Sequence, residues 1–352
     1  MSTPTSEPEV LDLAALTEDG FEALYAERLE PILSAHEETR RKHVSNFWFH
    51  MMLALPVGVI AACATYLLSK DGQATAFIGL SLAALTVGIA MLPIDQLRKT
   101  IKLELLESIS TAIGVRYQTH CAERPGFDRC IALGLAPKHD RGTFEDFFHG
   151  EREGLAFDLY EGLLQIERSD RYGRKRYDRV FHGQIIQLAF PKAFQGVTVV
   201  TRDAGFFNAP PADCYKRVGL ADPKFERLFE VYSNDQVEAR ALVHPVFMER
   251  LMEIEHAFKG GKVRCGFEGG HLLVMIEGRD KFEPGSMFNP LTDPARARRV
   301  VEDIAQVLRL MDAVLTAELA PLVALRASRA HAAAYRAARP EAPSLTFGRK
   351  TS

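Results

Sequence analysis

Two adjacent apolar runs constrain this chain more than any other feature. They cover Phe47–Leu68 and Gly72–Ile94, contain no Asp, Glu, Lys or Arg, and are separated only by Ser69-Lys70-Asp71. Each run exceeds the roughly 18–20 residues that a helix needs to cross a bilayer core of about 30 Å. Inside lipid the backbone must satisfy its own hydrogen bonds, so helices are the expected state. The pair predicts a transmembrane helical hairpin, and the alternative is a buried helical pair in a soluble core.

The residues around the two runs predict an orientation. Cations flank both outer ends, at Arg40, Arg41 and Lys42 before the first run and at Arg98, Lys99 and Lys102 after the second. The positive-inside rule places both flanks in the cytoplasm and the short turn outside. We therefore expect a multi-pass membrane protein whose N- and C-termini are both cytoplasmic.

Two further features of the runs suit a membrane. Trp48 and Tyr66 lie near the two ends of the first run, where aromatic belts form at the bilayer surface. Small residues in the second run allow close approach of two membrane helices. They are Gly79, Ser81, Ala83, Ala84 and Gly88.

Composition restricts the partners and the compartment. The chain has 43 Lys and Arg against 46 Asp and Glu, a net charge of −3, which gives no reason to expect nucleic-acid binding. The five cysteines form no CxxC pair and no cluster at metal-ligand spacing. Scattered cysteines of this kind suit reduced thiols in the cytosol, in agreement with the orientation predicted from the cations.

The rest of the chain predicts an α+β fold, in which a cytoplasmic domain with a mainly antiparallel sheet and packed helices follows the hairpin. Strands are expected at Gly154–Arg168, Arg179–Phe190, Gly196–Thr201, Leu228–Tyr232, Lys262–Phe267 and His271–Glu277, and helices at 234–258 and 293–330. The short connections favour antiparallel pairing, because parallel strands need crossovers of a dozen or more residues.

These elements divide the chain into five segments. An acidic N-terminus with an amphipathic approach helix precedes the hairpin, and a helical connector, which includes a helix over Asp95–Cys121, follows it. The expected segments are 1–46, the hairpin 47–94, the connector 95–142, the α+β domain 143–330 and a basic tail 331–352.

A short sequence occurs twice in the α+β domain. Phe148-His149-Gly150 and Phe181-His182-Gly183 are each followed, at the same spacing, by Leu-Ala-Phe. We interpret both as turns that precede strands. They mark either two related units or a coincidence between similar turns of one sheet.

A longer stretch, Phe225–Leu251, reads FERLFEVYSNDQVEARALVHPVFMERL. It resembles the bacterial membrane family known as domain of unknown function 3137, and the resemblance extends over most of residues 20–315. The residues that match its V-Y-S-x-D-x-x-E-A-R pattern are Val231, Tyr232, Ser233, Asp235, Glu238, Ala239 and Arg240. The resemblance implies a bacterial inner-membrane protein and implies no activity.

Asp235, Glu238 and Arg240 are the first candidate site. As a functional site they would form a polar cluster that binds a ligand or a partner. The structural interpretation is favoured, since Ser233 or Asn234 would cap a helix that holds Asp235 in its first turn. Glu238 and Arg240 would then tie that helix to the sheet.

The second candidate is a basic hairpin turn at Arg171, Arg174, Lys175 and Arg176. On a protein held at the cytoplasmic leaflet such a turn could contact anionic lipid headgroups or a protein partner. A solvated hairpin tip is an equally good interpretation.

No catalytic constellation is recognisable. His149, His182, His244 and His271 each stand alone, without an HExxH pair or a similar pattern, so neither a metal nor a cofactor is predicted. The leading hypothesis is a membrane-anchored interaction or scaffold module without catalysis, bound to the bilayer and to a protein partner. The rival is a membrane-associated hydrolase whose dispersed His and acidic residues converge only in the fold.

Overall fold

The computed structural model describes residues 19–312, apart from 153, 172, 191–192, 203–213, 259–260 and 310. The acidic start of the chain and the basic tail at 331–352 lie outside the described residues. The same holds for the part of the 293–330 helix that follows residue 312.

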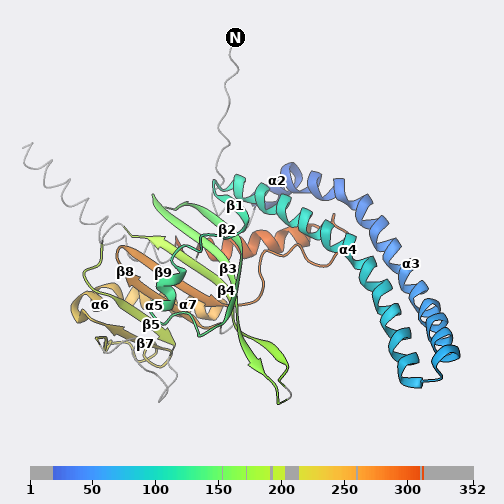
Figure 1. Ribbon diagram of the computed structural model, residues 1–352. Coiled ribbons are helices and arrows are strands. Elements are labelled where there is room, and N and C mark those ends of the chain that lie inside the picture. Colours follow the sequence, from blue (N-terminus) through green and yellow to red (C-terminus); the bar gives the residue numbers. More distant parts are fainter. Residues whose placement is uncertain are drawn as a thin grey trace, which may run out of the picture.

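Two long helices form a hairpin that extends from the body of the molecule (Figure 1). The chain enters through α2 (Asp19–Leu24) and a π-helical turn, η1 (Tyr25–Leu29), which immediately precede α3 (Glu30–Ser69). After a two-residue connection, α4 (Gly72–Ala112) returns alongside α3. Both helices are long and apolar enough to cross a membrane by length and composition. The predicted helical pair is confirmed.

Glycine lets the two helices of the hairpin touch. A Cβ on Gly79 would lie 2.8 Å from the carbonyl oxygen of Gly58, closer than any side chain tolerates. At the turn, Lys70 adopts a left-handed conformation (φ 56°), and the Asp71 carboxylate accepts a hydrogen bond from the backbone N–H of Gln73 at 2.8 Å. The outward faces are apolar, as shown by the three-quarters exposure of Leu55 and Leu80. This outer surface is unlike that of a buried helical pair in a soluble core.

Nine strands form one antiparallel sheet among the described residues, in the order β1-β2-β3-β4-β9-β8-β5-β7-β6. The predicted antiparallel sheet is confirmed. The strands are β1 (Arg116–His120), β2 (Arg141–Arg152), β3 (Leu155–Ser169), β4 (Lys175–Ala189), β5 (Thr198–Arg202), β6 (Lys216–Arg217), β7 (Phe229–Ser233), β8 (Val263–Glu268) and β9 (His271–Glu277).

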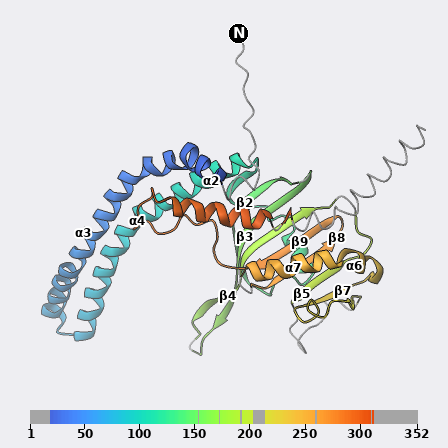
Figure 2. The ribbon, with the colours of Figure 1, turned by 180° about the vertical axis from the view of Figure 1, so that it is seen from behind.

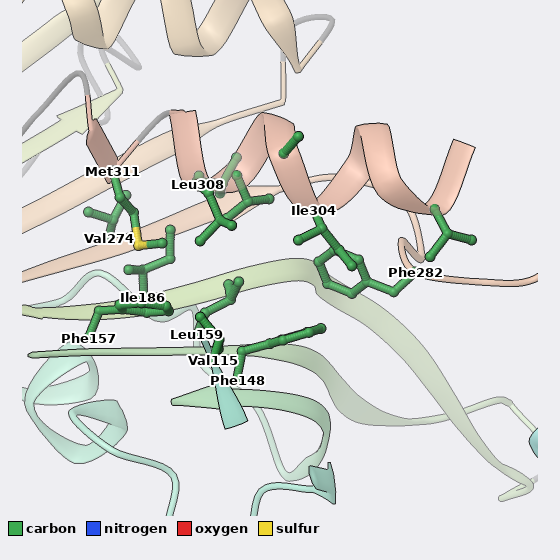
Figure 3. Close-up of a cluster of buried hydrophobic side chains, with 14 of the residues drawn as sticks. Val115, Phe148, Phe157, Leu159, Ile186, Val274, Phe282, Ile304, Leu308 and Met311 are labelled. Carbon is green, nitrogen blue, oxygen red and sulfur yellow. The ribbon is translucent and has the colours of Figure 1, made fainter. Parts of the chain in front are cut away.

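Helices cover both faces of the sheet. On one face lie α7 (Pro245–Ala257) and a helix over residues 294–309, and their apolar side chains meet those of the strands in the larger core. Figure 3 shows Ile304 and Leu308 of this helix, and Met311 after it, above Phe157 and Ile186. On the other face, α5 (Phe127–Ala132) covers a smaller core around Tyr160. The helix α6 (Gln236–Leu242) follows β7, and its buried Ala239 and Leu242 belong to the larger core.

The connector and the repeated tripeptide differ from the sequence predictions. The helix predicted over Asp95–Cys121 ends at Ala112, since Gly114 takes a positive φ of 70°, and the following residues form the edge strand β1. The segment 95–142 is therefore not helical throughout. Phe148–Gly150 and Phe181–Gly183 are not turns, because they lie inside β2 and β4.

Gly183 explains why a glycine stands inside a strand. Its φ is 156°, and a Cβ built on it would lie 2.0 Å from the backbone oxygen of Ile276 on the neighbouring β9. Glycine here allows close backbone approach rather than a change of chain direction.

Candidate functional site

The side chains of Asp235, Glu238 and Arg240 all form hydrogen bonds to other groups of the domain. The Asp235 carboxylate accepts hydrogen bonds from the backbone N–H groups of Val237 and Glu238, both at 2.9 Å, so Asp235 itself is the N-cap of α6. Glu238 accepts from the N–H of Gly196 at 2.7 Å, which ties α6 to the segment before β5. Arg240 donates to groups of Gln236 on its own helix instead of to the sheet. The three side chains do not converge on a common point.

The four basic residues lie at the exposed end of the β3–β4 hairpin, and most of them have acidic neighbours. Ion pairs join Arg174 to Asp170 at 3.4 Å, Lys175 to Glu167 at 2.9 Å and Arg176 to Asp178 at 2.8 Å. Arg171 is also exposed. Six cations and three acids fall between Glu167 and Arg179, so the tip keeps a net positive charge.

The two histidines of the repeated tripeptide each pair with a carboxylate of β3. His149 lies 2.6 Å from Asp158, and His182 lies 2.7 Å from Glu161. Because Asp158 and Glu161 are three residues apart in one strand, they point to opposite faces of the sheet. The two pairs therefore cannot form one site.

The remaining histidines have separate positions. The His244 ring accepts from the N–H of Phe247 at 3.4 Å and caps α7, whereas His271 begins β9. Within the described part of the chain, no three His, Cys, Asp or Glu side chains are arranged to hold a metal ion.

A buried charge network is the most unusual polar feature of the described residues. Lys102, on the last third of α4, lies 2.8 Å from Asp146 and 2.6 Å from Glu283. The hydroxyl of Tyr117 donates to the other oxygen of Asp146 at 2.8 Å. Asp146 sits in the β-bulge between Glu145 and Phe148 with a positive φ of 54°, and its side chain is 1 % exposed. The network joins the hairpin to the sheet.

Burial and charge shift the titration of this network in opposite directions. Burial raises the pKa of Asp146 to about 6, although Lys102 opposes the shift. Burial alone would lower the pKa of Lys102, but its attraction to Asp146 and Glu283 outweighs burial and raises that pKa. The ammonium group therefore stays charged, and it is the main stabilising partner of a carboxylate that has little access to water.

A second set of polar groups continues the network along the same face. The backbone N–H of Lys281 donates to Glu161 at 3.2 Å, and the Lys281 ammonium lies 2.9 Å from Asp303 on the 294–309 helix. Burial raises the pKa of Glu161 to about 6, and the hydrogen bond to Glu161 raises the pKa of His182. Gln184, the cross-strand neighbour of Glu161, is fully buried, and neither atom of its amide has a partner among the described residues.

A third set of contacts holds α3 against the domain. Glu37 binds the guanidinium of Arg40 at 2.8 Å and accepts from the backbone N–H of Leu291 at 2.9 Å. Arg40 in turn donates to the carbonyl of Met287 at 3.1 Å. The hydrogen bond from Arg40 holds the pKa of Glu37 at about 2, well below its ordinary value.

Sequence analysis did not identify these networks as a site. Lys102 was noted only as a cation that flanks the second apolar run. Asp146, Glu161 and Glu283 carry no local pattern, because their partners lie far away in the sequence. The repeated Phe-His-Gly tripeptide was the one local sequence signal near these networks.

Glu161 makes the stability of the protein depend on pH. Between pH 4.5 and 6 the unfolded carboxyl ionises while the folded one keeps its proton, so rising pH should remove roughly 2 kcal/mol of folding free energy. The raised pKa of His182 acts in the same direction, since its contribution is lost as pH rises through that pKa. Glu161→Gln should make the profile of unfolding free energy against pH shallower, measured by urea denaturation, and should leave the slope that Asp146 contributes. Identical profiles for both proteins would contradict this assignment.

Comparisons with known proteins give a family and a distant structural likeness. No curated protein matches the chain. Among solved structures, the crystal structure of the mycobacterial trehalose monomycolate transport factor A, TtfA, aligns with a TM-score of 0.30 and 14% identity, over 58% of this chain and 93% of that one. The model of the family described as "Protein of unknown function (DUF3137)" matches residues 179–315, a shorter stretch than the resemblance noted in the sequence. The matched residues begin within β4 and include the 294–309 helix, and the description of that family names no function.

Proposed function

We propose that this protein is a membrane-anchored interaction or scaffold module of the bacterial inner membrane, without catalysis, whose sheet domain faces the cytoplasm. The observation that carries the proposal is the α3–α4 hairpin, which exposes large apolar side chains along both helices over the length of a bilayer core. Exposed apolar surface of this extent is unfavourable in water and favourable in lipid.

The way the hairpin joins the domain supports a positioning role. Lys102 and Glu37 bind partners in the sheet and in the 283–291 segment, and no flexible linker separates α4 from β1. An anchor built in this way presents the domain in a fixed orientation, which suits the recruitment of a protein partner. A hydrolase would need converging catalytic groups, and the two His–carboxylate pairs lie on opposite faces of the sheet.

Topology tests this proposal directly. Reporter fusions at residue 20, at Asp71 and after the last residue should read cytoplasmic, extracytoplasmic and cytoplasmic, as the flanking cations require. The fusion proteins should be found in the membrane fraction. They should also resist extraction at high pH, a treatment that releases peripheral proteins. An extracytoplasmic fusion after the last residue would overturn the orientation, and a soluble protein would overturn the anchor.

We further propose that the tip of the β3–β4 hairpin contacts anionic lipid headgroups. Figures 1 and 2 show this hairpin and the α3–α4 hairpin extending toward the same side of the molecule. Arg174 and Arg176 keep about four-fifths of their side-chain surface exposed despite their acidic neighbours. Each cation near an anionic surface contributes about 1 kcal/mol, and the adjacent acids reduce that sum.

Protection from chymotrypsin tests the tip. Chymotrypsin can cleave after Tyr177, which is half exposed and lies beside the cations. The variant in which Ser replaces Arg171, Arg174, Lys175 and Arg176 keeps this cleavage site. In anionic vesicles at low salt, the wild type should be cleaved there more slowly than the variant. High salt should abolish the difference, because the attraction decays over about 10 Å at 0.1 M salt. Equal cleavage of the wild type and the variant at low salt would show that the tip is a solvated turn that does not contact lipid.

A further inference from the structure

Two buried arginines fix the segment 284–289, which connects β9 to the 294–309 helix. The guanidinium of Arg296 donates to the carbonyls of Pro284, at 2.5 Å, and of Ser286 and Asn289. From the other side, Arg40 of α3 donates to the carbonyl of Met287 at 3.1 Å. Both arginines are almost fully buried, so the segment is held rigidly at its backbone.

The fixed segment presents one aromatic side chain outward, at Phe288. Met287 packs into the core, whereas Phe288 is 39 % exposed. Its ring lies against the start of the first apolar run, with ring centroids 5.1 Å from Phe47 and 6.4 Å from Trp48, both in edge-to-face geometry. Trp48 is itself half exposed. The sheet domain thus places an aromatic ring at the level where the apolar surface of α3 begins.

We infer that the 284–289 segment is a second membrane contact, in which Phe288 enters the interfacial layer of the cytoplasmic leaflet beside Trp48. Aromatic rings are favoured at this depth, where one side meets acyl chains and the other meets headgroups. The exposed ring is continuous with the apolar surface of the hairpin, and the buried arginines satisfy backbone carbonyls that would otherwise lose their water at the bilayer surface.

This inference rests on the proposed anchor and extends it. The anchor requires only that α3 and α4 cross the bilayer, and a domain on such an anchor could stand clear of the surface. Contact by Phe288 instead seats the sheet domain directly on the lipid, with its distance from the bilayer set by the backbone hydrogen bonds of Arg40 and Arg296.

The single tryptophan of the chain allows a test with two separable readouts. The wild type, reconstituted as the full chain in phosphatidylcholine and phosphatidylglycerol vesicles, reports only on Trp48. Trp48→Phe combined with Phe288→Trp moves the reporter into the 284–289 segment, and Trp48→Phe combined with Asn289→Trp provides a second reporter there. Trp48→Phe with Val237→Trp is the control, since Val237 is 79 % exposed on α6, at the far end of the sheet (Figure 1).

Lipids with brominated acyl chains quench tryptophans that reach the hydrocarbon boundary, and iodide quenches those in water. The reporter at position 288 should lose as large a fraction of its emission to brominated lipid as Trp48 does, and the reporter at position 237 should respond only to iodide. Quenching of Trp48 without quenching at 288 or 289 would overturn the inference and leave the anchor intact. Trp48 insensitive to brominated lipid would overturn the anchor as well.

Discussion

Replacing Lys102 with Met should lower the free energy of unfolding by about 3 kcal/mol, because it leaves the buried Asp146 carboxylate without its cation and removes a partner of Glu283, which is partly exposed. The methionine chain fills nearly the same volume, so the loss reports charge rather than packing. Urea denaturation in detergent micelles, followed by the circular dichroism of the sheet, measures the change. Lys102 joins α4 to β2, and the variant should therefore also loosen the hairpin from the domain.

Two further variants decide whether burial of the charges is the cause. Lys175→Met breaks an ion pair of similar length at the exposed hairpin tip and should leave the unfolding midpoint unchanged. Adding Asp146→Asn to Lys102→Met should recover part of the loss, because the uncompensated charge is removed. A midpoint that moves equally for Lys102→Met and Lys175→Met would contradict the assignment of a buried network.

Gly183→Ala should destabilise the sheet by about 3 kcal/mol, since the added methyl group would overlap the Ile276 carbonyl and force β4 away from β9. Gly183 lies at one end of the pairing of β4 with β9, which runs to Ala189. The same denaturation measurement applies, and hydrogen exchange should show the loss of protection concentrated in β4 and β9.

Gly154→Ala provides the matched control. Gly154 also has a positive φ, of 74°, but a Cβ there meets nothing within 4 Å. Its replacement should therefore cost only the conformational penalty of about 1 kcal/mol. Equal losses for the two variants would show that backbone conformation, rather than contact with Ile276, explains the glycine at 183.

Local sequence patterns were sufficient to predict the helices and strands that are marked by long apolar runs or by clear turn residues. The hairpin followed from two charge-free runs, and the pair β8 and β9 followed from the turn signal Glu268-Gly269-Gly270 between two apolar stretches. The edge strand β1 was missed because most of its side chains are exposed, so RYQTH has no alternation to detect. Its pairing with β2 depends on a partner far away in the chain.

The polar networks could not be predicted for a related reason. Lys102 and Glu283 carry no signal that they meet, since burial and pairing arise only when α4, β2 and the 278–285 segment assemble. By contrast, Asp235 acts on its own helix, where it is the N-cap in place of the predicted Ser233 or Asn234. Glu238 ties that helix to Gly196, 42 residues earlier in the chain. Arg240 does not reach the sheet, because it folds back onto the preceding turn of α6.

The unbroken course of α4 has a mechanical consequence. The helix runs from the outer turn at Gly72 to Ala112, and Lys102 on the same helix is fixed to the sheet. A helical pair adapts to a thinner bilayer by tilting, at a cost of fractions of a kcal/mol per ångström of mismatch. Because α4 continues through Pro93 without a break, the proposed membrane anchor would make it a lever, and tilting of its membrane part would turn the whole domain relative to the membrane plane. Because lipid composition sets bilayer thickness, the orientation of the sheet relative to the membrane would then depend on lipid composition.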